Sequence, residues 1–348
     1  MQRVTGSVQH YDWGSLDAIP KLLGRQPDGR PWAEWWLGTH PVAPSTLNDG
    51  TALSDIAGEL PYLLKILAAA QPLSLQTHPS KAQAEAGFAR ENSMGIPLTA
   101  PRRIYRDPNP KPEMLMAITR FEALCGVRPD ANAIALLKTL QAYDLADEVS
   151  GMGVGATIEH LYRHNIRLDA TLAACMSRPE PEATLVAALA AEYPNDPSTI
   201  VTLLLNRVVL QPGEALFLGP GNLHAYLHGV GVEVMGASDN VVRGGMTNKH
   251  VDVDELMRVV DLSPLDNPVF LPDLVSPGVW RYDTPGTRFR LWRYELDGAL
   301  NHKASSRELW LCLKGRSGPL HGGTAAYVGP GERLALEGPA TLIRVEER

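Results

Sequence analysis

The spacing of apolar residues changes twice along this chain of 348 residues. Between about positions 125 and 197, apolar side chains recur at the spacing of amphipathic helices, as in 130–143, 157–166 and 181–193. On both sides of this block, short apolar runs are separated by glycine- and proline-containing turns, a pattern typical of β-strands. The sequence therefore predicts a mainly β fold, with the helices inserted into, or packed beside, a β-domain that is split in the sequence.

The strand-like pattern continues to the C-terminus. The stretches 202–210 and 215–219, joined by a turn at 211–214, predict a β-hairpin. Alternating residues in 287–296, 308–315 and 332–336 predict a second, smaller β-domain. At about 150 residues per domain, the length also suits roughly two domains with an added segment. We predict a first β-domain from 1–124 together with 198–264, a helical domain at 125–197, and a C-terminal β-domain at 265–348.

The charge balance disfavours several classes of partner. With 32 basic and 39 acidic residues, the formal net charge is −7, and no long basic run is present. Such a chain is a poor candidate for binding nucleic acid or an anionic membrane. The most apolar stretch, 60–75, is interrupted by Lys65, Gln71 and Pro72 and cannot span a bilayer. The N-terminus lacks a signal-peptide pattern and the three cysteines are far apart, so we expect a cytoplasmic protein without a disulfide framework.

Tryptophan is concentrated near the N-terminus. Four of the seven tryptophans lie within the first 36 positions, namely Trp13, Trp32, Trp35 and Trp36. We expect core aromatics of a loop-rich β-domain, with a rim contact beside a sugar-sized pocket as the alternative.

Gln76 and His78 form the first pair of candidate ligands. The two residues are two positions apart, so on a strand they project to the same face. A glutamine oxygen and an imidazole nitrogen on one face can supply two ligands to a metal such as zinc. Taken alone, such a pair is more often structural than metal-binding.

Lys111 and Glu113 lie at the end of a proline-rich segment. Three prolines, Pro108, Pro110 and Pro112, hold the backbone extended and reduce the entropy lost on folding. A rigid segment would present the lysine and the carboxylate in fixed directions, as a metal ligand beside a proton-transfer or anion-binding group. The alternative is a surface linker with solvated charges.

His224 follows a strand and a tight turn. The turn is Gly219, Pro220 and Gly221, and the spacing from Gly213 to His224 resembles the second half of the cupin signature, with Gly219 where cupins usually have proline. Such a turn would let the histidine point into a barrel. Together with Gln76, His78 and Glu113, it would complete four nitrogen and oxygen ligands suited to zinc.

Arg243 precedes two glycines, Gly244 and Gly245, where the backbone can turn or approach a ligand closely. The guanidinium group offers a planar fork of donors matched to oxyanions. A lone arginine near glycines is more often a surface salt-bridge partner.

In order along the chain, these segments resemble the type I mannose-6-phosphate isomerases. The blocks that carry the resemblance are YDWG (11–14), AEWWLGTHPVAPS (33–45), LPYLLKIL (60–67), SLQTHPSK (74–81), YRDPNPKPEM (105–114), GPGNLHAY (219–226) and EVMGASDNVVRGGMTNKHVDV (233–253). Many bacterial members have histidine before the lysine of the fifth block, where this chain has Pro110. A mechanism that gives this histidine an acid–base role cannot apply here unchanged.

The resemblance implies a zinc-dependent aldose–ketose isomerase that interconverts mannose 6-phosphate and fructose 6-phosphate through an enediol-type intermediate. It implies two cupin-type jelly-roll barrels with a helical domain, one Zn²⁺ per chain, and no metal in the C-terminal barrel, which contains His302 and His321. We expect a monomer whose partner is the sugar phosphate. By the same resemblance, the zinc ligands are Gln76, His78, Glu113 and His224, Arg243 is catalytic, and other pocket residues are Ser74, Lys65, Lys111, Glu233, Asp239 and Lys249.

Two assignments stay open at the level of sequence. The base that moves the proton could be Lys111, Glu233 or a metal-bound hydroxide. The phosphate could meet some of Lys65, Lys81, Arg243 and Lys249. Alternative functions are a non-catalytic sugar-phosphate-binding bicupin and another metal cupin enzyme such as a dioxygenase. The dioxygenase pattern differs, because Glu113 lies 113 − 78 = 35 positions after His78 rather than close behind it.

Overall fold

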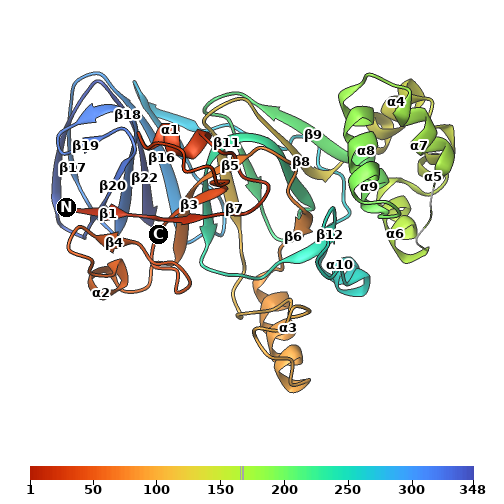
Figure 1. Cartoon of the computed structure of the whole chain (residues 1–348), viewed down its shortest axis with the longest axis horizontal. Helices are drawn as coiled ribbons and strands as arrows, with labels where there is room; N and C mark the ends of the chain where they lie inside the picture. Colours follow the sequence, from red (N-terminus) through yellow and green to blue (C-terminus); the bar gives the residue numbers. More distant parts are fainter. Residues whose placement is uncertain (165, 167) are drawn as a thin grey trace.

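A computed structural model describes residues 1–164, 166 and 168–348. It contains two β-domains and a helical domain, which lie in a row in Figure 1 with the C-terminal β-domain at one end and the helices at the other. The predicted mainly β fold with a helical insertion is confirmed. The first β-domain lies in the middle, so it is the part that contacts both neighbours.

The middle domain is an eleven-stranded sheet within the described residues, built mostly from antiparallel pairs. Its longest strand, β11, runs through 13 residues and joins two parts of the sheet. The first residues of β11 pair with β6 and β8, and the later ones pair with β5 and β7, with a bulge between Tyr226 and His228. The strands are β2 (Ser7–Gln9), β3 (Glu34–Leu37), β5 (Tyr62–Ala69), β6 (Leu75–Thr77), β7 (Glu113–Ala117), β8 (Phe121–Val127), β9 (Leu205–Leu210), β10 (Ala215–Leu218), β11 (His224–Gly236), β12 (Val242–Gly245) and β13 (Val269–Phe270).

The predicted hairpin between 202–210 and 215–219 is wrong. Strand β9 pairs with β8, whereas β10 pairs with β7 and β13. The turn at 211–214 therefore carries the chain from one part of the sheet to another, and residues Thr202–Leu204 form a 3₁₀ turn instead of strand. Sequence periodicity identifies strands of this kind but not their partners, because tertiary packing selects the pairing.

The C-terminal domain pairs β14 (Asp273–Ser276), β15 (Val279–Tyr282), β16 (Phe289–Leu296), β18 (Glu308–Ser317), β19 (Leu320–His321), β20 (Thr324–Val328) and β22 (Ala340–Glu347), with β17 (Ala299–Lys303) and β21 (Arg333–Glu337) as a separate pair. It also takes β1 (Gln2–Thr5) and β4 (Thr46–Leu47) from the N-terminal region. The predicted range 1–124 for the first domain thus includes two short strands that belong to the second sheet.

The two β-domains share one hydrophobic core. Trp35, Tyr62 and Met114 from the middle domain pack in one buried cluster with Leu309 and Val345 from the C-terminal domain. The hydroxyl of Tyr62 also donates a hydrogen bond to the Val345 carbonyl, at 3.1 Å. A continuous apolar core of this kind favours one fixed arrangement of the two sheets.

The helical domain contains α4 (Asp130–Leu140), α5 (Tyr143–Met152), α6 (Val154–His164), α7 (Asp169–Met176), α8 (Pro181–Glu192) and α9 (Ser198–Val201). Its core includes Leu75, Leu223 and Val242 of the middle sheet, next to the candidate ligands Gln76 and His224. Outside this domain lie α1 (Ala18–Leu22), α2 (Leu53–Ala57), α3 (Lys81–Ser93) and α10 (Val253–Val259).

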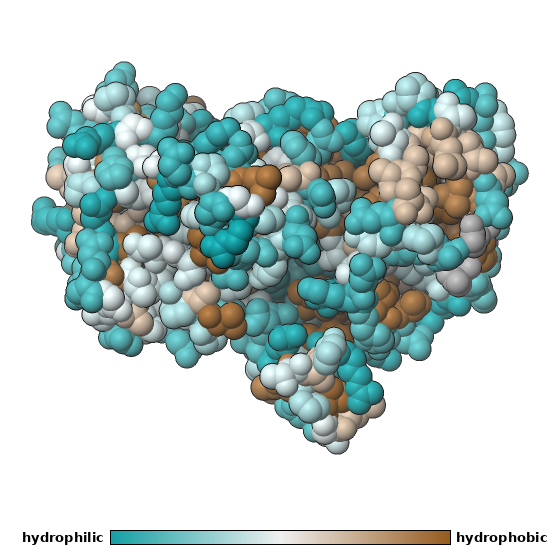
Figure 2. Space-filling view, in the orientation of Figure 1, coloured by the Kyte–Doolittle hydropathy of each residue, from teal (hydrophilic) through white to brown (hydrophobic). Residues whose placement is uncertain are grey.

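Among the described residues, no helix has the length and apolar character needed to cross a membrane. The face drawn in Figure 2 is mostly hydrophilic, with a large apolar area over the helical domain.

Candidate metal and substrate site

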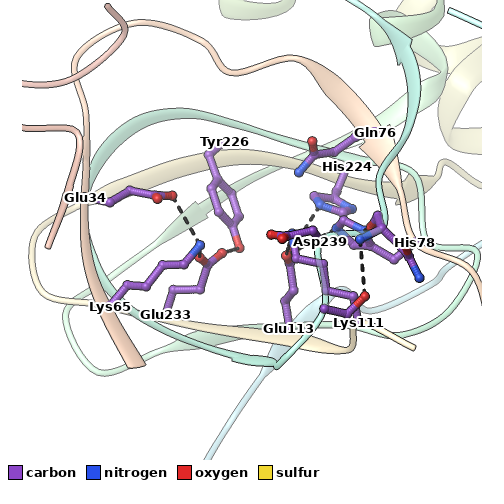
Figure 3. Close-up of polar contacts among 12 residues, drawn as sticks. Glu34, Lys65, Gln76, His78, Lys111, Glu113, His224, Tyr226, Glu233 and Asp239 are labelled. Atoms are coloured by element: carbon purple, nitrogen blue, oxygen red, sulfur yellow. Dashed lines mark hydrogen bonds and ion pairs between the residues drawn. The ribbon is translucent and has the colours of Figure 1, made fainter. Parts of the chain in front are cut away.

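Three of the four proposed metal ligands converge inside the middle domain. His78 follows β6, Glu113 begins β7 and His224 begins β11. The Nε2 atom of His78 lies 3.2 Å from Glu113 Oε1, and the Nε2 atom of His224 lies 3.4 Å from Glu113 Oε2. All three residues are buried, and their ligand atoms lie within 4.8 Å of one another. Figure 3 shows them pointing toward a common space.

The second nitrogen of each imidazole is already bonded. His78 Nδ1 donates to the Asn240 carbonyl at 2.8 Å, and His224 Nδ1 donates to the Asn222 carbonyl at 3.0 Å. Because a carbonyl oxygen only accepts, each Nδ1 must carry a proton, so in the neutral form of either ring the lone pair is on Nε2. Burial lowers the pKa of His78 to about 4, so this imidazole is neutral near pH 7. Neutral imidazoles in this tautomer are suited to bind a metal.

The facing atoms of the cluster are close together but form no hydrogen bond of acceptable geometry. His78 Nε2, His224 Nε2 and Glu113 Oε2 are buried and accept or donate no hydrogen bond within the described structure. Burial alone would raise the pKa of Glu113, but interactions with His78 and Lys111 hold it well below its usual value. Buried polar atoms without partners are costly, and a divalent cation bound between them would satisfy all three. The donor chemistry therefore fits a metal such as zinc.

Gln76 lies beside this cluster in the sheet. It is the cross-strand partner of His224 on one side and of Arg243 on the other. Directly opposed residues project to the same face of a sheet, so the register aligns the three side chains. The Ser74 hydroxyl lies 3.5 Å from Gln76 Oε1. The structure thus brings Gln76 next to the three converging ligands and Arg243 next to Gln76.

Lys111 contacts the ligand set directly. Its Nζ atom lies 2.9 Å from Glu113 Oε1, and the side chain is mostly buried. The backbone leading to it runs against β11, where the Gly236 N–H donates to the Pro112 carbonyl at 2.9 Å. A Cβ atom at Gly236 would lie 3.1 Å from Pro110 O and Pro112 Cδ, so a glycine permits this close approach. Pro110 directly precedes Lys111, so it belongs to the backbone that packs closely against Gly236.

A second buried polar cluster lies beside the first, as Figure 3 shows. Lys65 Nζ is 2.9 Å from Glu233 Oε2 and 3.3 Å from Glu34 Oε1. The Tyr226 hydroxyl donates to Glu233 Oε1 at 2.8 Å. Burial would lower the pKa of Lys65, but Glu233 and Glu34 raise it above its usual value, so the lysine stays charged. Burial raises the pKa of Glu233, and Lys65 opposes this rise.

Three cations that form no ion pair with another described residue lie around the outer part of the site. They are Arg243, which is half-buried, and the exposed residues Arg106 and Lys249. Burial lowers the pKa of Arg243, and repulsion from Arg106 adds to the effect. Burial also lowers the pKa of Lys249, together with repulsion from Arg243 and Arg106. A group of mutually repelling cations that water can reach is suited to attract an anion.

Asp239 borders these cations and the metal cluster. His40 Nε2 lies 3.3 Å from its Oδ1 atom. The interaction with His40 lowers the pKa of Asp239, and nearby Lys111 and Arg106 lower it further. The carboxylate is therefore charged and only half-buried, at the boundary between the buried ligands and solvent.

In the described structure, Lys81 forms no hydrogen bond or ion pair with the candidate metal ligands or with the outer cations. Its Nζ atom pairs with Glu85 at 3.2 Å and donates to the Pro108 carbonyl at 3.0 Å, and the side chain is exposed. The two glycines after Arg243 were expected to allow a turn or a close approach to a ligand. The pairing of β12 with β6 is irregular between Arg243 and Gly245, and Gly245 packs against the helical domain, where a Cβ atom would lie 2.2 Å from Ser198 Oγ. The Tyr162 hydroxyl donates to the Gly244 carbonyl at 2.6 Å.

Several residues of the site were missed at the sequence level. Glu34 and Trp36 share a strand face, and the Trp36 indole N–H donates to Glu34 Oε2 at 2.6 Å. Tyr226 lies two positions after His224 on β11, a spacing that also predicts a shared face. Period-two spacing could have placed Glu34 beside Trp36 and Tyr226 beside His224, although it does not indicate that Glu34 meets Lys65. Arg106 and Asn240 lie in irregular segments, where no local pattern indicates which way a side chain points.

Comparison with known proteins identifies similar chains. Residues 1–130 match the family model for the catalytic domain of type I phosphomannose isomerase. The mannose-6-phosphate isomerase of Escherichia coli strain K12 is 34% identical, over 98% of this chain and 97% of its own length. The human mannose-6-phosphate isomerase is 28% identical, over 95% of this chain and 94% of its own.

Solved structures give the same result. A crystal structure of a lysine-to-alanine variant of the phosphomannose isomerase from Salmonella typhimurium superposes with a TM-score of 0.90 and 32% identity, covering 100% of this chain and 99% of that one. A mannose 6-phosphate isomerase bound with zinc and yttrium superposes with a TM-score of 0.85 and 30% identity, with the same coverage.

Proposed function

The chain belongs to the type I phosphomannose isomerase family, and from this premise we propose that it interconverts mannose 6-phosphate and fructose 6-phosphate with one zinc ion held by Gln76, His78, Glu113 and His224. The observation that carries the proposal is the convergence of buried metal-ligating atoms on His78, Glu113 and His224, three of which form no hydrogen bond. A related isomerase whose crystal structure contains zinc supports the choice of metal.

The ligand set favours a catalytic over a purely structural zinc. Structural zinc sites prefer cysteine and histidine, whereas this set contains a neutral glutamine and a single carboxylate. Zinc bound there would act as a Lewis acid that polarises the carbonyl of the open-chain sugar. The reaction moves a proton between two neighbouring carbons through an enediol, so it also needs an acid–base group and a cation for the developing oxyanion.

Arg243 is suited to stabilise the oxyanion. It is aligned with Gln76 across β6 and β12, has no competing carboxylate in the described structure, and stays protonated at neutral pH. Lys111 is the candidate for proton transfer, because it contacts Glu113 without being a ligand itself. Glu233 is a weaker candidate, since Tyr226 and Lys65 occupy its two oxygens.

The phosphate of the substrate would meet the outer cations. Lys65 is buried and neutralised by Glu34 and Glu233, so it is not free to bind an anion, whereas Lys81 forms only an exposed and therefore weak pair with Glu85. Arg106 and Lys249 are exposed and form no ion pair in the described structure. Both lie near Arg243: repulsion from Arg106 lowers the pKa of Arg243, and repulsion from Arg243 lowers the pKa of Lys249. A sugar phosphate would then extend from the buried ligands toward solvent. The monomeric state and the cytoplasmic location stay predictions.

A coupled assay tests the proposal. Conversion of mannose 6-phosphate to fructose 6-phosphate is measured on the purified protein, after chelation, and after zinc is returned. We expect activity that disappears with the metal and returns with zinc. Zinc-loaded, folded protein without isomerase activity would contradict the proposal and favour a non-catalytic sugar-phosphate-binding protein. Activity that survives complete metal removal would instead reject the zinc assignment.

A further inference from the structure

We propose that Asn240 is a positioning residue that joins the proline segment (residues 106–112) to the metal ligand His78. The inference rests on the proposed function, because its consequence is the correct placement of the zinc ligands and of Lys111. Asn240 itself is fully buried. It forms no hydrogen bond with the Glu113 carboxylate or with the Nε2 atoms of the two proposed histidine ligands. Its effect would therefore be exerted through other residues.

The side chain of Asn240 holds the proline segment by its backbone. Its Oδ1 atom accepts hydrogen bonds from the backbone N–H groups of Arg106, at 2.7 Å, and Asp107, at 3.3 Å. Its Nδ2 atom donates to the carbonyls of Asp107, at 2.8 Å, and Asn109, at 2.9 Å. One amide group thus satisfies donors and acceptors on three residues of the segment.

The main chain of Asn240 holds the metal ligand. Its carbonyl oxygen accepts the proton on His78 Nδ1 at 2.8 Å, which fixes the ring orientation and the tautomer. Asn240 therefore holds the proline segment, which presents Lys111 and Glu113, by its side chain, and holds the His78 imidazole by its main-chain carbonyl. A shift of the segment relative to the imidazole would change the distances between the proposed zinc ligands.

Ser238 and Asp107 reinforce the connection. The Ser238 hydroxyl donates to Asp107 Oδ2 at 3.1 Å and accepts from the Asn240 N–H at 3.2 Å. Asp107 Oδ2 also accepts from the Asp239 N–H at 3.0 Å. The pocket residue Asp239 is thereby tied to the same segment.

The proline segment needs such an external support. Pro108, Pro110 and Pro112 have no backbone N–H, so this stretch cannot form a regular ladder with a neighbouring strand. Regular pairing begins only at Glu113, where β7 starts. The prolines make the segment stiff, and Asn240 determines where the stiff segment lies. Stiffness without this attachment would not orient Lys111.

The test uses Asn240→Ala and Ser238→Ala, with Thr287→Val as the matched control. Thr287 is a buried residue of the C-terminal domain whose hydroxyl donates to the Phe289 carbonyl at 2.8 Å, with the Thr284 carbonyl 3.1 Å away as the alternative acceptor. The control loses a buried side-chain-to-carbonyl bond outside the domain that holds the proposed metal ligands. For each variant and the parent, we would measure zinc affinity by competition with a chromogenic chelator, kcat and KM, and the Tm of the metal-free protein.

For Asn240→Ala, we expect kcat to fall by about 100-fold, because a misplacement of about 1 Å has an effect of this size. Zinc affinity should fall by about 10- to 100-fold, the usual effect of losing support around a ligand. Ser238→Ala should show smaller changes in the same direction, and the double variant should lose less than the product of the two single effects. Thr287→Val should lower Tm and leave zinc affinity and kcat unchanged.

The outcomes separate the inference from the proposed function. If the parent binds zinc and isomerises the sugar while both variants lower only Tm, as the control does, the positioning role is overturned and the function stands. If the parent itself neither binds zinc nor isomerises the sugar, the proposed function fails first. Should Asn240→Ala not fold, Ser238→Ala decides the matter by the same two measurements.

Discussion

The two β-domains contain buried clusters of similar residue types, but the clusters are bonded in different ways. In the middle domain, His78, Glu113 and His224 leave three buried polar atoms without a hydrogen-bond partner. In the C-terminal domain, His302, Glu308 and Arg344 are bonded to one another and to Trp310, and Arg344 Nε is the one buried polar atom of these side chains that has no hydrogen-bond partner in the described structure.

The bonding in the C-terminal cluster uses both carboxylate oxygens of Glu308. His302 Nε2 lies 3.0 and 2.9 Å from the two oxygens, and the Trp310 indole N–H donates to Oε2 at 2.8 Å. The Arg344 guanidinium lies 4.5 Å from the centre of the Trp292 ring, a cation–π distance, and 3.2 Å from Glu346. These charges are neutralised within the protein.

The difference teaches how to separate a ligand site from a stabilising network. Burial of a histidine and a glutamate occurs in both domains and is uninformative by itself. Several ligand atoms that converge on one space without hydrogen bonds indicate a missing cation, whereas the unpaired Arg344 Nε belongs to a network whose charges are neutralised. Four substitutions would break or sharpen this comparison.

The largest effect is expected for Glu113→Gln. The change removes the only negative charge among the four proposed ligands and keeps the size of the side chain. We expect zinc affinity and kcat to fall by on the order of 1,000-fold, more than the 10- to 100-fold effect of a supporting residue. Metal analysis and the coupled assay check this, and retention of stoichiometric zinc by the variant would refute the ligand assignment.

Arg243→Ala should have the next largest effect. Removal of a group that stabilises an oxyanion typically lowers kcat by about 10²- to 10³-fold. Because Arg243 is aligned with Gln76 but belongs to no ion pair in the described structure, the zinc content should stay as in the parent. Steady-state kinetics and metal analysis on one preparation distinguish the two effects. A variant with normal kcat would leave Arg243 without a catalytic role.

Glu308→Gln tests the other cluster. The side chain is fully buried against His302 and Arg344, so the change leaves Arg344 without full compensation. We expect the free energy of unfolding to fall by about 3 kcal/mol. Zinc content and kcat of the folded protein should not change. Denaturant unfolding measures the first quantity, and a loss of zinc would show that the two clusters are not independent.

Tyr162→Phe should have the smallest effect. It removes the bond from the helical domain to the Gly244 carbonyl, which is next to Arg243. Loss of one such hydrogen bond costs about 1 kcal/mol of stability, and we expect kcat to fall by a few-fold as β12 loosens.

The matched control for this change is Tyr282→Phe. The Tyr282 hydroxyl donates to the Gly213 carbonyl at 2.6 Å, the same distance as the bond from Tyr162. The control should lose similar stability with an unchanged kcat. Equal kcat values for the two variants would mean that the helical domain does not support Arg243.

Local patterns predicted much of the site because its ligands lie on or next to regular strands. Gln76 and His78 were identified by period two, and Glu113 and His224 by the turn or proline segment before each strand. Lys81 was named among the basic residues that could meet the phosphate; it begins α3 and pairs with Glu85, and its role stays a prediction. Glu34 was missed because it lies 31 positions before its partner Lys65.

The sequence by itself determined the fold class, the order of strands and helices, and the family, because periodicity, turn residues and ordered motifs are local properties of a chain. Only the tertiary structure decided which strands pair, as β9 and β10 demonstrate. It also decided which charges are neutralised: Lys65 is paired, whereas Arg106 and Lys249 form no ion pair among the described residues. Pairing and neutralisation depend on contacts between residues far apart in the chain, and Asn240 joins His78 to the proline segment by such contacts.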